Sequence, residues 1–212
     1  MRYVLLCSAW LSLALSTYAL AGEVQLGEAQ CGPIKTGFGP YDYTNPADVR
    51  DHLGIVEGAH FLPYVERLIK GHSSYLGGDI DYTLRAFPNH HRALSSMANL
   101  SIRDKTDKPV GANWVVLCYF ERAIRFKPND SRVRLIYALY LNRRGNKDEA
   151  LVQLKKAYEL RPDSANINYD LGLLYLDHKD YENAKIHAKK AYELGFPLPG
   201  LKNRLIKAGK WD

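Results

Sequence analysis

The sequence predicts an all-α protein, a short α-solenoid of about three helix pairs with a C-terminal capping helix and an irregular N-terminal cap. Three observations lead to this prediction. A proline-containing junction returns at a fixed spacing of 34 residues, one pattern of apolar and small residues precedes each copy, and a polar turn divides each unit into two helices. Units of this kind bury a continuous core only when they are stacked on one another.

The repeat is clearest at its junctions. The segment FKPNDS at 126–131 returns as LRPDSA at 160–165. The helix before each junction follows one pattern, seen in CYFERAI (118–124), VQLKKAY (152–158) and IHAKKAY (186–192). Because proline lacks a backbone donor and clashes with the preceding turn, each junction is expected to end the second helix of its unit.

These landmarks resemble the tetratricopeptide repeat, a pair of helices with large and small residues at set positions. The matching residues are Tyr137, Ala138, Leu141, Ala150, Leu154, Ala157 and Pro162 in one unit, and Leu171, Gly172, Tyr175, Ala184, Ala188, Ala191 and, one place late, Pro197 in the next. Small residues are needed where two helices cross closely. The stretch 77–94 also resembles uncharacterised exported tetratricopeptide proteins of proteobacteria, which brings no activity with it.

The chain then divides into a signal peptide at 1–21, an N-terminal arm and cap at 22–87, and a repeat domain at 88–212. Within the repeat domain we expect repeats near 91–130, 131–164 and 165–198, followed by a capping helix at 199–209. The first repeat has a longer turn between its helices, from Arg103 to Gly111, and its second helix is expected to resume near Ala112.

The N-terminus predicts export. Arg2 precedes an apolar run from Val4 to Leu15, and Ala19-Leu20-Ala21 provides the small residues that signal peptidase requires. Cleavage near Ala21 would give a periplasmic or secreted chain that begins at Gly22. The alternative is an uncleaved anchor, although the run is shorter than the ~20 residues that usually span a bilayer. No later segment is apolar enough to cross a membrane, so no stable membrane insertion is expected after cleavage.

Residues 22–87 follow no clear repeat. The stretch from Cys31 to Pro46 is rich in Gly, Pro and Tyr and predicts an ordered but irregular arm. Short helices are expected over 47–57 and 63–70, the second one stopped by Gly71. Gly77-Gly78 is expected to break the chain before a further helix at 79–87, which would be the second helix of a degenerate repeat.

Signal-peptide removal leaves Cys31 and Cys118, and two thiols in an oxidising compartment are more often paired than free. A bridge would tie the arm to the helical body and stabilise the fold by about 4 kcal/mol in the chain-entropy account. The alternative is two unrelated buried cysteines.

One group of residues has the chemistry of a metal site. Asp79, Asp81, His90 and His91, with His60 and His72 upstream, offer carboxylates and imidazoles. However, His90 and His91 point in different directions on a helix. The alternative assigns Asp79 to a helix N-cap and the two histidines to the first turn of the next helix. We expect no metal and no cofactor.

Composition and motifs argue against catalysis and nucleic-acid binding. The formal charge of +6 is spread along the chain, and nucleic-acid binding typically needs a basic stripe on one face. The sequence contains no nucleophile elbow, no zinc-protease motif and no phosphate-binding glycine loop. We therefore expect a protein that is not an enzyme.

The resemblance implies a concave groove lined by the first helix of each repeat. The family's ligand positions fall on Arg92, Ser95, Asn99 and Arg103; on Arg132, Leu135, Leu139, Asn142 and Arg143; and on Asn166, Tyr169, Leu173 and Asp177. The family's two-carboxylate clamp needs a lysine and asparagines where this chain has Leu135 and Leu139. An extended or helical peptide with some acidic character therefore fits better, unless the arginines simply form a solvated face.

Together, these observations predict a non-catalytic scaffold or adaptor of the cell envelope that binds a partner peptide in the groove. The alternative is a metal- or carbohydrate-binding envelope protein that uses the His/Asp-containing N-terminal region.

Overall fold

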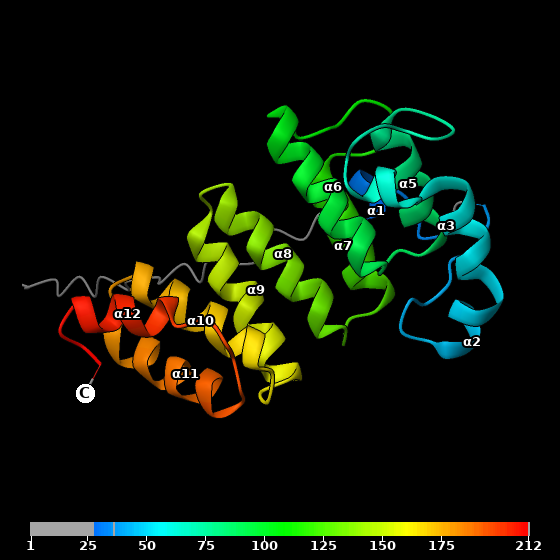
Figure 1. Cartoon of the computed structure of the whole chain (residues 1–212). Coiled ribbons are helices and arrows are strands. Elements are labelled where there is room, and N and C mark those ends of the chain that lie inside the picture. Colours follow the sequence, from blue (N-terminus) through cyan, green and yellow to red (C-terminus); the bar gives the residue numbers. More distant parts are fainter. Residues whose placement is uncertain (1–27, 36, 212) are drawn as a thin grey trace, which may run out of the picture.

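The computed structural model describes residues 28–35 and 37–211, and this part of the chain contains helices and no strand. The expected signal peptide lies outside the described residues. The elements are α1 (Glu28–Cys31), α2 (Pro46–Asp48), the π-helix η1 (Val49–Leu53), α3 (Gly54–His60), α4 (Pro63–Glu66), α5 (Leu76–Ala86), α6 (His91–Asp104), α7 (Val116–Phe126), α8 (Ser131–Arg143), α9 (Lys147–Leu160), α10 (Ala165–Asp177), α11 (Tyr181–Glu193) and α12 (Gly200–Lys207). Figure 1 shows an elongated stack with α2 and α3 near one end and α12 near the other. The prediction of an all-α solenoid is confirmed.

Three helix pairs form the body of the stack, α6 with α7, α8 with α9 and α10 with α11 (Figure 1). The polar residue that follows each junction proline starts the next pair. The carboxylate of Asp130 accepts hydrogen bonds from the backbone N–H of Arg132 (3.0 Å) and Val133 (3.2 Å). The hydroxyl of Ser164 caps α10 by accepting from the N–H of Ile167 at 3.4 Å. Both side chains satisfy donors that have no partner inside the helix.

Small residues let the helices of a pair approach one another. Ala150, Ala157, Ala184 and Ala188 are fully buried. A Cβ added to Gly172 would lie 2.4 Å from the Cδ2 of Leu201 and 3.2 Å from the carbonyl oxygen of Ala184. The glycine is therefore required by the contact between α10, α11 and the capping helix α12, which buries Leu201 over the end of the last pair.

The first pair departs from the expected boundaries. Its second helix, α7, begins at Val116 and not near Ala112, and Lys105 ends α6 in a left-handed conformation (φ 52°). Between them, the side-chain amide of Asn113 donates to the carboxylate of Asp81 at 3.0 Å. Residues 112–115 therefore cover α5 instead of extending α7.

Gly77-Gly78 does not break the chain, because both residues lie in the first turn of α5. A Cβ on Gly77 would lie 2.4 Å from the carbonyl oxygen of Val110, and one on Gly78 would lie 2.4 Å from the hydroxyl of Ser74. The two glycines thus permit close contact between α5 and neighbouring loops. Helix α5 packs on α6 through Ile80 and Leu84, as expected for the second helix of a degenerate repeat.

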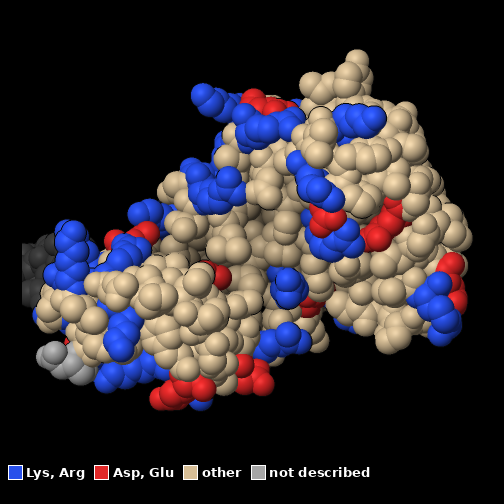
Figure 2. Space-filling model, in the orientation of Figure 1, with Lys and Arg blue, Asp and Glu red and all other residues tan. Residues whose placement is uncertain are grey.

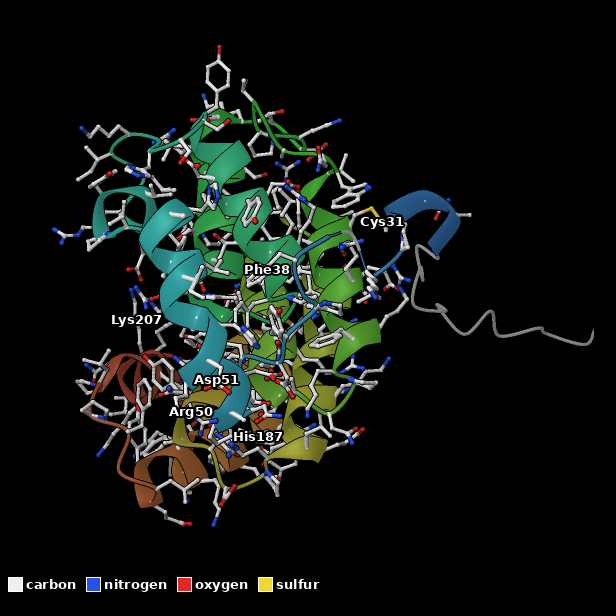
Figure 3. The ribbon with its side chains drawn as sticks, turned by 90° about the vertical axis from the view of Figure 1, so that its right-hand side faces the viewer. Cys31, Phe38, Arg50, Asp51, His187 and Lys207 are labelled. Carbon is white, nitrogen blue, oxygen red and sulfur yellow. A yellow bond between two sulfur atoms is a disulfide. The ribbon has the colours of Figure 1, made fainter. Side chains whose placement is uncertain are left out.

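The helices of the cap also differ in length from their predictions. Segments α2, η1 and α3 form one continuous helical segment from Pro46 to His60. This segment carries the exposed ion pair Arg50–Asp51 (2.8 Å; Figure 3). In contrast, α4 ends at Glu66 and not at Lys70, because Leu68 adopts φ +60°. This turn lets Leu68 pack against the core while Ile69 remains 67% exposed.

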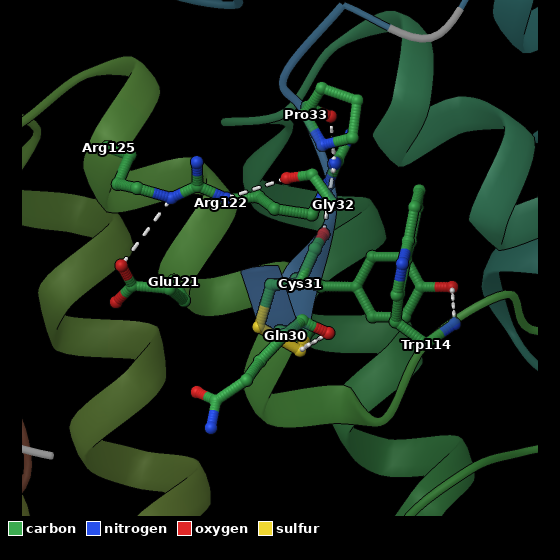
Figure 4. Close-up of a disulfide and its surroundings, with 10 residues drawn as sticks. Gln30, Cys31, Gly32, Pro33, Trp114, Glu121, Arg122 and Arg125 are labelled. Carbon is green, nitrogen blue, oxygen red and sulfur yellow. Dashed lines mark hydrogen bonds and ion pairs between the residues drawn. A yellow bond between two sulfur atoms is a disulfide. The ribbon is translucent and has the colours of Figure 1, made fainter. Parts of the chain in front are cut away.

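The N-terminal arm is bound to α7. Helix α1 packs on α7, and a disulfide joins Cys31 to Cys118, whose Cα atoms lie 5.0 Å apart. The guanidinium of Arg122 donates to the arm carbonyls of Cys31 (3.2 Å), Pro33 and Ile34 (3.3 Å). It also lies 4.1 Å from the centre of the Trp114 ring. Figure 4 shows both side chains together with the arm residues Cys31 to Pro33. Burial lowers the pKa of Arg122, so these carbonyls and the ring compensate a desolvated cation.

Further along, the arm is held at a repeat junction. The carboxylate of Asp42 accepts from the ammonium of Lys127 (2.7 Å) and the side-chain amide of Asn89 (2.8 Å). Burial opposes ionisation, but these donors and Thr44 hold the pKa of Asp42 well below its usual range. Asn89 also accepts from the backbone N–H of Tyr43 and donates to Asp130. One buried asparagine therefore links the arm to two successive repeats.

Candidate peptide-binding groove

A groove runs across α6, α8 and α10, the first helices of the three pairs. It consists of two adjoining depressions, of about 570 Å³ and about 260 Å³, which share Ser95, Asn99, Ile136 and Leu139. Figure 2 shows this face of the molecule hollowed between its N-terminal and C-terminal parts. We call the two depressions together the groove.

Helix periodicity explains which side chains of α8 line the groove. Residues three or four positions apart share one face of a helix, and Arg132, Leu135, Ile136 and Leu139 follow this spacing. The opposite face of α8 carries Val133, Ala138 and Leu141, which are buried in the core. The groove therefore has an aliphatic floor, on which Leu139 is 40% exposed.

An aromatic pair forms the wall of the groove near the C-terminal end of the stack. The rings of Tyr169, on α10, and Phe196, which follows α11, are stacked with centroids 3.9 Å apart and planes 18° apart. A Cβ on Gly200 would lie 2.9 Å from the Tyr169 hydroxyl oxygen, so the start of α12 also packs against this ring. The wall is thus built from three elements.

Most of the charged groups at the groove are already compensated. The guanidinium of Arg92 is paired with Glu66 (Nε to Oε1, 2.7 Å) and with Glu57 (3.1 Å). The ring of His91 is bonded to Asp130 at 2.8 Å, and Arg143 donates to the side chain of Asn99. These contacts hold the side chains in place, and the carboxylates of Glu57 and Glu66 neutralise Arg92. The hydrogen bond to the neutral amide of Asn99 leaves the positive charge of Arg143 in the groove.

Two charged side chains of the groove have no hydrogen-bond or ion-pair partner within the part of the chain that the structure describes. The side chain of Arg132, at the start of α8, is exposed and makes no hydrogen bond or ion pair there. Asp170, on α10, also has no donor near its carboxylate, and burial raises its pKa to about 7. The groove therefore presents one unpaired cation and one partly protonated acid, in addition to the charge of Arg143.

The structure brings most of the predicted groove residues together. The larger depression contains Arg92, Ser95, Asn99, Arg132, Leu135, Leu139, Asn166 and Tyr169, and the smaller one adds Asn142 and Arg143. Three predicted positions lie elsewhere. Arg103 donates to the backbone carbonyl of Leu68 at 2.7 Å, Leu173 packs near the capping helix, and Asp177 pairs with Arg204 at 2.7 Å.

Other groove residues were not predicted. Asp170 lies next to a family ligand position but not on one. Phe196 lies in the connection after α11, and Glu66 belongs to the cap, so neither is on a first helix. The 34-residue spacing points only to the first helices of the repeats. The one available signal in the sequence was that Asp170 is the only charged residue between Ala165 and Leu176.

The His/Asp cluster does not converge on a site. The carboxylate of Asp79 accepts from the backbone N–H of His72 (2.6 Å) and Ser73 and lies 3.1 Å from the His60 ring. Asp81 instead binds Arg85 (2.9 Å) and the hydroxyl of Tyr119 (2.5 Å). Within residues 28–35 and 37–211, no group of three or more His, Cys, Asp or Glu side chains is placed to hold a metal ion.

The interpretation of Asp79 as a helix N-cap is wrong, because α5 begins three residues earlier, at Leu76. Its carboxylate instead holds the loop before the helix. The residue that caps a helix is His90, whose Nδ1 accepts from the N–H of Ala93 at 3.1 Å. Burial lowers the pKa of His90, and the neutral ring must then donate from Nε2 to Glu57 at 2.9 Å. Only His91 of the pair lies in the first helical turn.

The repeats identify the class of protein. Family models described as "TPR repeat" and "Tetratricopeptide repeat" match residues 141–179 and 165–194. The chain therefore contains tetratricopeptide repeats, which generally belong to non-catalytic scaffolds for protein–protein interaction. Among the described helices, none has the length and apolar character needed to cross a membrane.

Two solved structures of MamA are similar to this chain. One, MamA MSR-1 C2, is 21% identical over 73% of this chain and 80% of its own, with a TM-score of 0.44. A mutant of MamA is 22% identical over 73% of this chain and 81% of its own, also with a TM-score of 0.44. A search of curated proteins gave no match. Likeness at this level carries no argument about partners.

Proposed function

We propose that this chain is a scaffold of the cell envelope that binds a segment of a partner protein in the groove along α6, α8 and α10. The observation that carries the proposal is the continuous groove itself, with an exposed aliphatic floor and unpaired charges. A solvated helix face needs neither feature. An exposed Leu139 beside Leu135 and Ile136 gains by desolvation when a partner covers it.

An envelope location is supported by the N-terminal sequence pattern and by the Cys31–Cys118 disulfide. Disulfides persist in oxidising compartments and are rare in the cytosol. Fractionation of cells, with N-terminal sequencing of the purified chain, tests this part of the proposal. We expect an extracytoplasmic chain that begins at Gly22; a cytosolic chain that retains Met1 would contradict it.

Site-specific photo-crosslinking in cells tests the groove. A photoreactive amino acid at position 139 is expected to capture a discrete partner. The matched control is position 186, because Ile186 is an equally apolar residue, 60% exposed, on α11 outside the groove. Capture of the same proteins from both positions would contradict groove binding.

A substitution sharpens the same test. Leu139→Asp should abolish capture of the partner from a second groove position, such as Asn166, whereas Ile186→Asp should leave it unchanged. Helical content measured by circular dichroism should be the same for both variants, because both side chains are exposed. Undiminished capture by Leu139→Asp would exclude the groove as the binding site.

A further inference from the structure

The carboxylate of Asp170 differs in its surroundings from the other acids that face the groove or lie near it. Glu66 is paired with Arg92, and Asp130 accepts from His91 and from the start of α8. Asp170 lines the larger depression, whose apolar and aromatic lining residues are Leu135, Ile136, Leu139, Tyr169 and Phe196. Within residues 28–35 and 37–211 it accepts no hydrogen bond and forms no ion pair.

This arrangement disfavours some ligands and favours others. Covering an unpaired carboxylate with a neutral apolar segment removes its remaining water and gives nothing in return, which is energetically costly. Covering it with a cation replaces that water by a charge-assisted hydrogen bond in a poorly solvated place, where such bonds are strong. The charge of the occupant at this position therefore decides whether binding is favourable.

Among residues 28–35 and 37–211, no lysine or arginine of the chain pairs with Asp170. Burial is what raises the pKa of Asp170 to about 7, with no nearby positive charge to offset it. The cations lining the same depression are Arg92, which Glu66 and Glu57 neutralise, and Arg132, which lies at the start of α8. The positive charge that Asp170 lacks must come from the ligand.

We propose that Asp170 determines the specificity of the groove by binding one lysine or arginine side chain of the partner segment. This inference rests on the proposed groove function. The aliphatic part of that side chain packs along the ring of Tyr169, and neighbouring apolar residues of the segment cover Leu135 and Leu139. An acidic residue of the same segment faces Arg132, so the two free charges of opposite sign fix the direction in which the segment lies.

A library of acetylated and amidated decapeptides, immobilised on beads, is the probe. The chain from Gly22 to Asp212, with its disulfide intact, is the protein. The variants are Asp170→Asn, which removes the charge and keeps the shape, and Asp148→Asn, the matched control. The side chain of Asp148 is 96% exposed and lies on α9 outside the groove. Leu139→Asp reports whether binding uses the groove at all.

The wild-type chain and Asp148→Asn should enrich peptides with lysine or arginine at one position, beside apolar residues. Asp170→Asn should reduce the affinity of a selected peptide roughly tenfold or more and lose the basic preference, while keeping the apolar one. A preference for basic peptides that persists in Asp170→Asn would overturn the inference. Binding of the wild type to apolar peptides that contain no lysine or arginine would overturn it as well. In both cases the groove function would stand.

A different result would overturn the proposed function itself. If no peptide is retained, or if Leu139→Asp retains the same peptides as the wild type, the groove is not a binding site and the inference fails with it. Retention that Leu139→Asp abolishes supports the groove. The two failures therefore give distinguishable results.

Affinity as a function of pH provides a second measurement. Below pH 7, a growing share of Asp170 must lose a proton before it can bind a cation, so affinity should fall between pH 8 and pH 5.5. The other charged or titratable groups facing the groove are Glu66, His91, Arg92, Arg132, Tyr140, Arg143 and Tyr169. Because these remain in Asp170→Asn, that variant should show a clearly flatter profile; an equally steep one would contradict the inference.

Discussion

The cap and the repeats achieve the same dense packing by different means. From α8 to α11, alanines and one glycine at regular spacing let helices cross, and the side chains that do this are apolar and small. Between residues 28 and 90, single polar residues hold irregular segments in place, as Asp79, Asp81 and Asn89 do. Repetition makes the repeats tolerant of single substitutions, because each unit is stabilised only by its neighbours. The second depends on individual residues.

The largest effect is therefore expected in the cap. Asp81→Ala removes a buried carboxylate that accepts from Arg85, Asn113 and Tyr119. It leaves the Tyr119 hydroxyl and the Arg85 guanidinium without their partner, so the free energy of unfolding should fall by about 3 kcal/mol. Denaturant titration measures it. Asp148→Ala, which changes an exposed acid, should lower the free energy of unfolding by less than about 0.5 kcal/mol. Equal losses in the two variants would contradict the comparison between cap and repeats.

Opening the disulfide should have an effect of similar size. The double substitution Cys31→Ser and Cys118→Ser releases a covalent link across 87 residues, and we expect a loss of about 2–4 kcal/mol. Faster hydrogen exchange should appear in residues 28–35 and not in α10. The intact mass of the wild type should also lie two hydrogens below that of the reduced chain. Labelling of both thiols without denaturant would show that no such link exists.

A smaller and local effect is expected in the repeats. Gly172→Val places a branched side chain against Leu201 and the backbone of Ala184, which should cost about 1–3 kcal/mol. Hydrogen exchange should increase in α10, α11 and α12 but not in α5. The matched control is Gly58→Val in α3, where an added Cβ meets nothing within 4 Å. Unfolding of the cap in Gly172→Val would show that the two regions are coupled.

The smallest effect concerns the groove without ligand. Burial raises the pKa of Asp170 in the folded chain to about 7, from an ordinary value of 3.8. The unfolded chain therefore loses this proton first, and the free energy of unfolding falls as pH rises from about 4 to 7. Asp170→Asn avoids this cost. The free energy of unfolding of the variant should equal that of the wild type at pH 4 and exceed it by about 1 kcal/mol at pH 8. This difference is smaller than the conversion of 1.36 kcal/mol per pKa unit gives, because water in the open groove reduces the effect. A constant difference across pH would contradict the shift.

The sequence predicted the repeats better than the cap for the same physical reason that separates the two regions. The 34-residue spacing repeats the same crossing of two helices, so Ala150 and Ala184 occupy equivalent positions in successive repeats. In the cap, the early end of α4 depends on φ +60° at Leu68. Gly77 and Gly78 lie inside a helix, and they are glycines because Val110 and Ser74 leave no room for a Cβ atom. Neither Val110 nor the conformation of Leu68 is indicated by local pattern, since both depend on contacts between distant residues.

Prediction of the candidate site divides in a similar way. The spacing of the first helices placed Arg132, Leu135, Leu139 and Tyr169 on one face, and all four line the groove. It did not show that Arg103 turns away to the carbonyl of Leu68, because that carbonyl belongs to the cap. Nor could it show that Arg92 is neutralised by Glu57 and Glu66. Spacing predicts the direction of a side chain but not its partners.

The attachment of the arm to α7 also sets an order of events in time. The surface that receives the arm, with Trp114, Cys118 and Arg122, is made after the arm itself, and 87 positions separate the two bonded cysteines. At ~5–20 residues per second, Cys31 waits roughly 4–17 s before Cys118 has been synthesised. Throughout that interval its thiol has no proper partner within the chain. The bridge between the arm and the first repeat can therefore close only after the start of the second helix of that repeat has been synthesised.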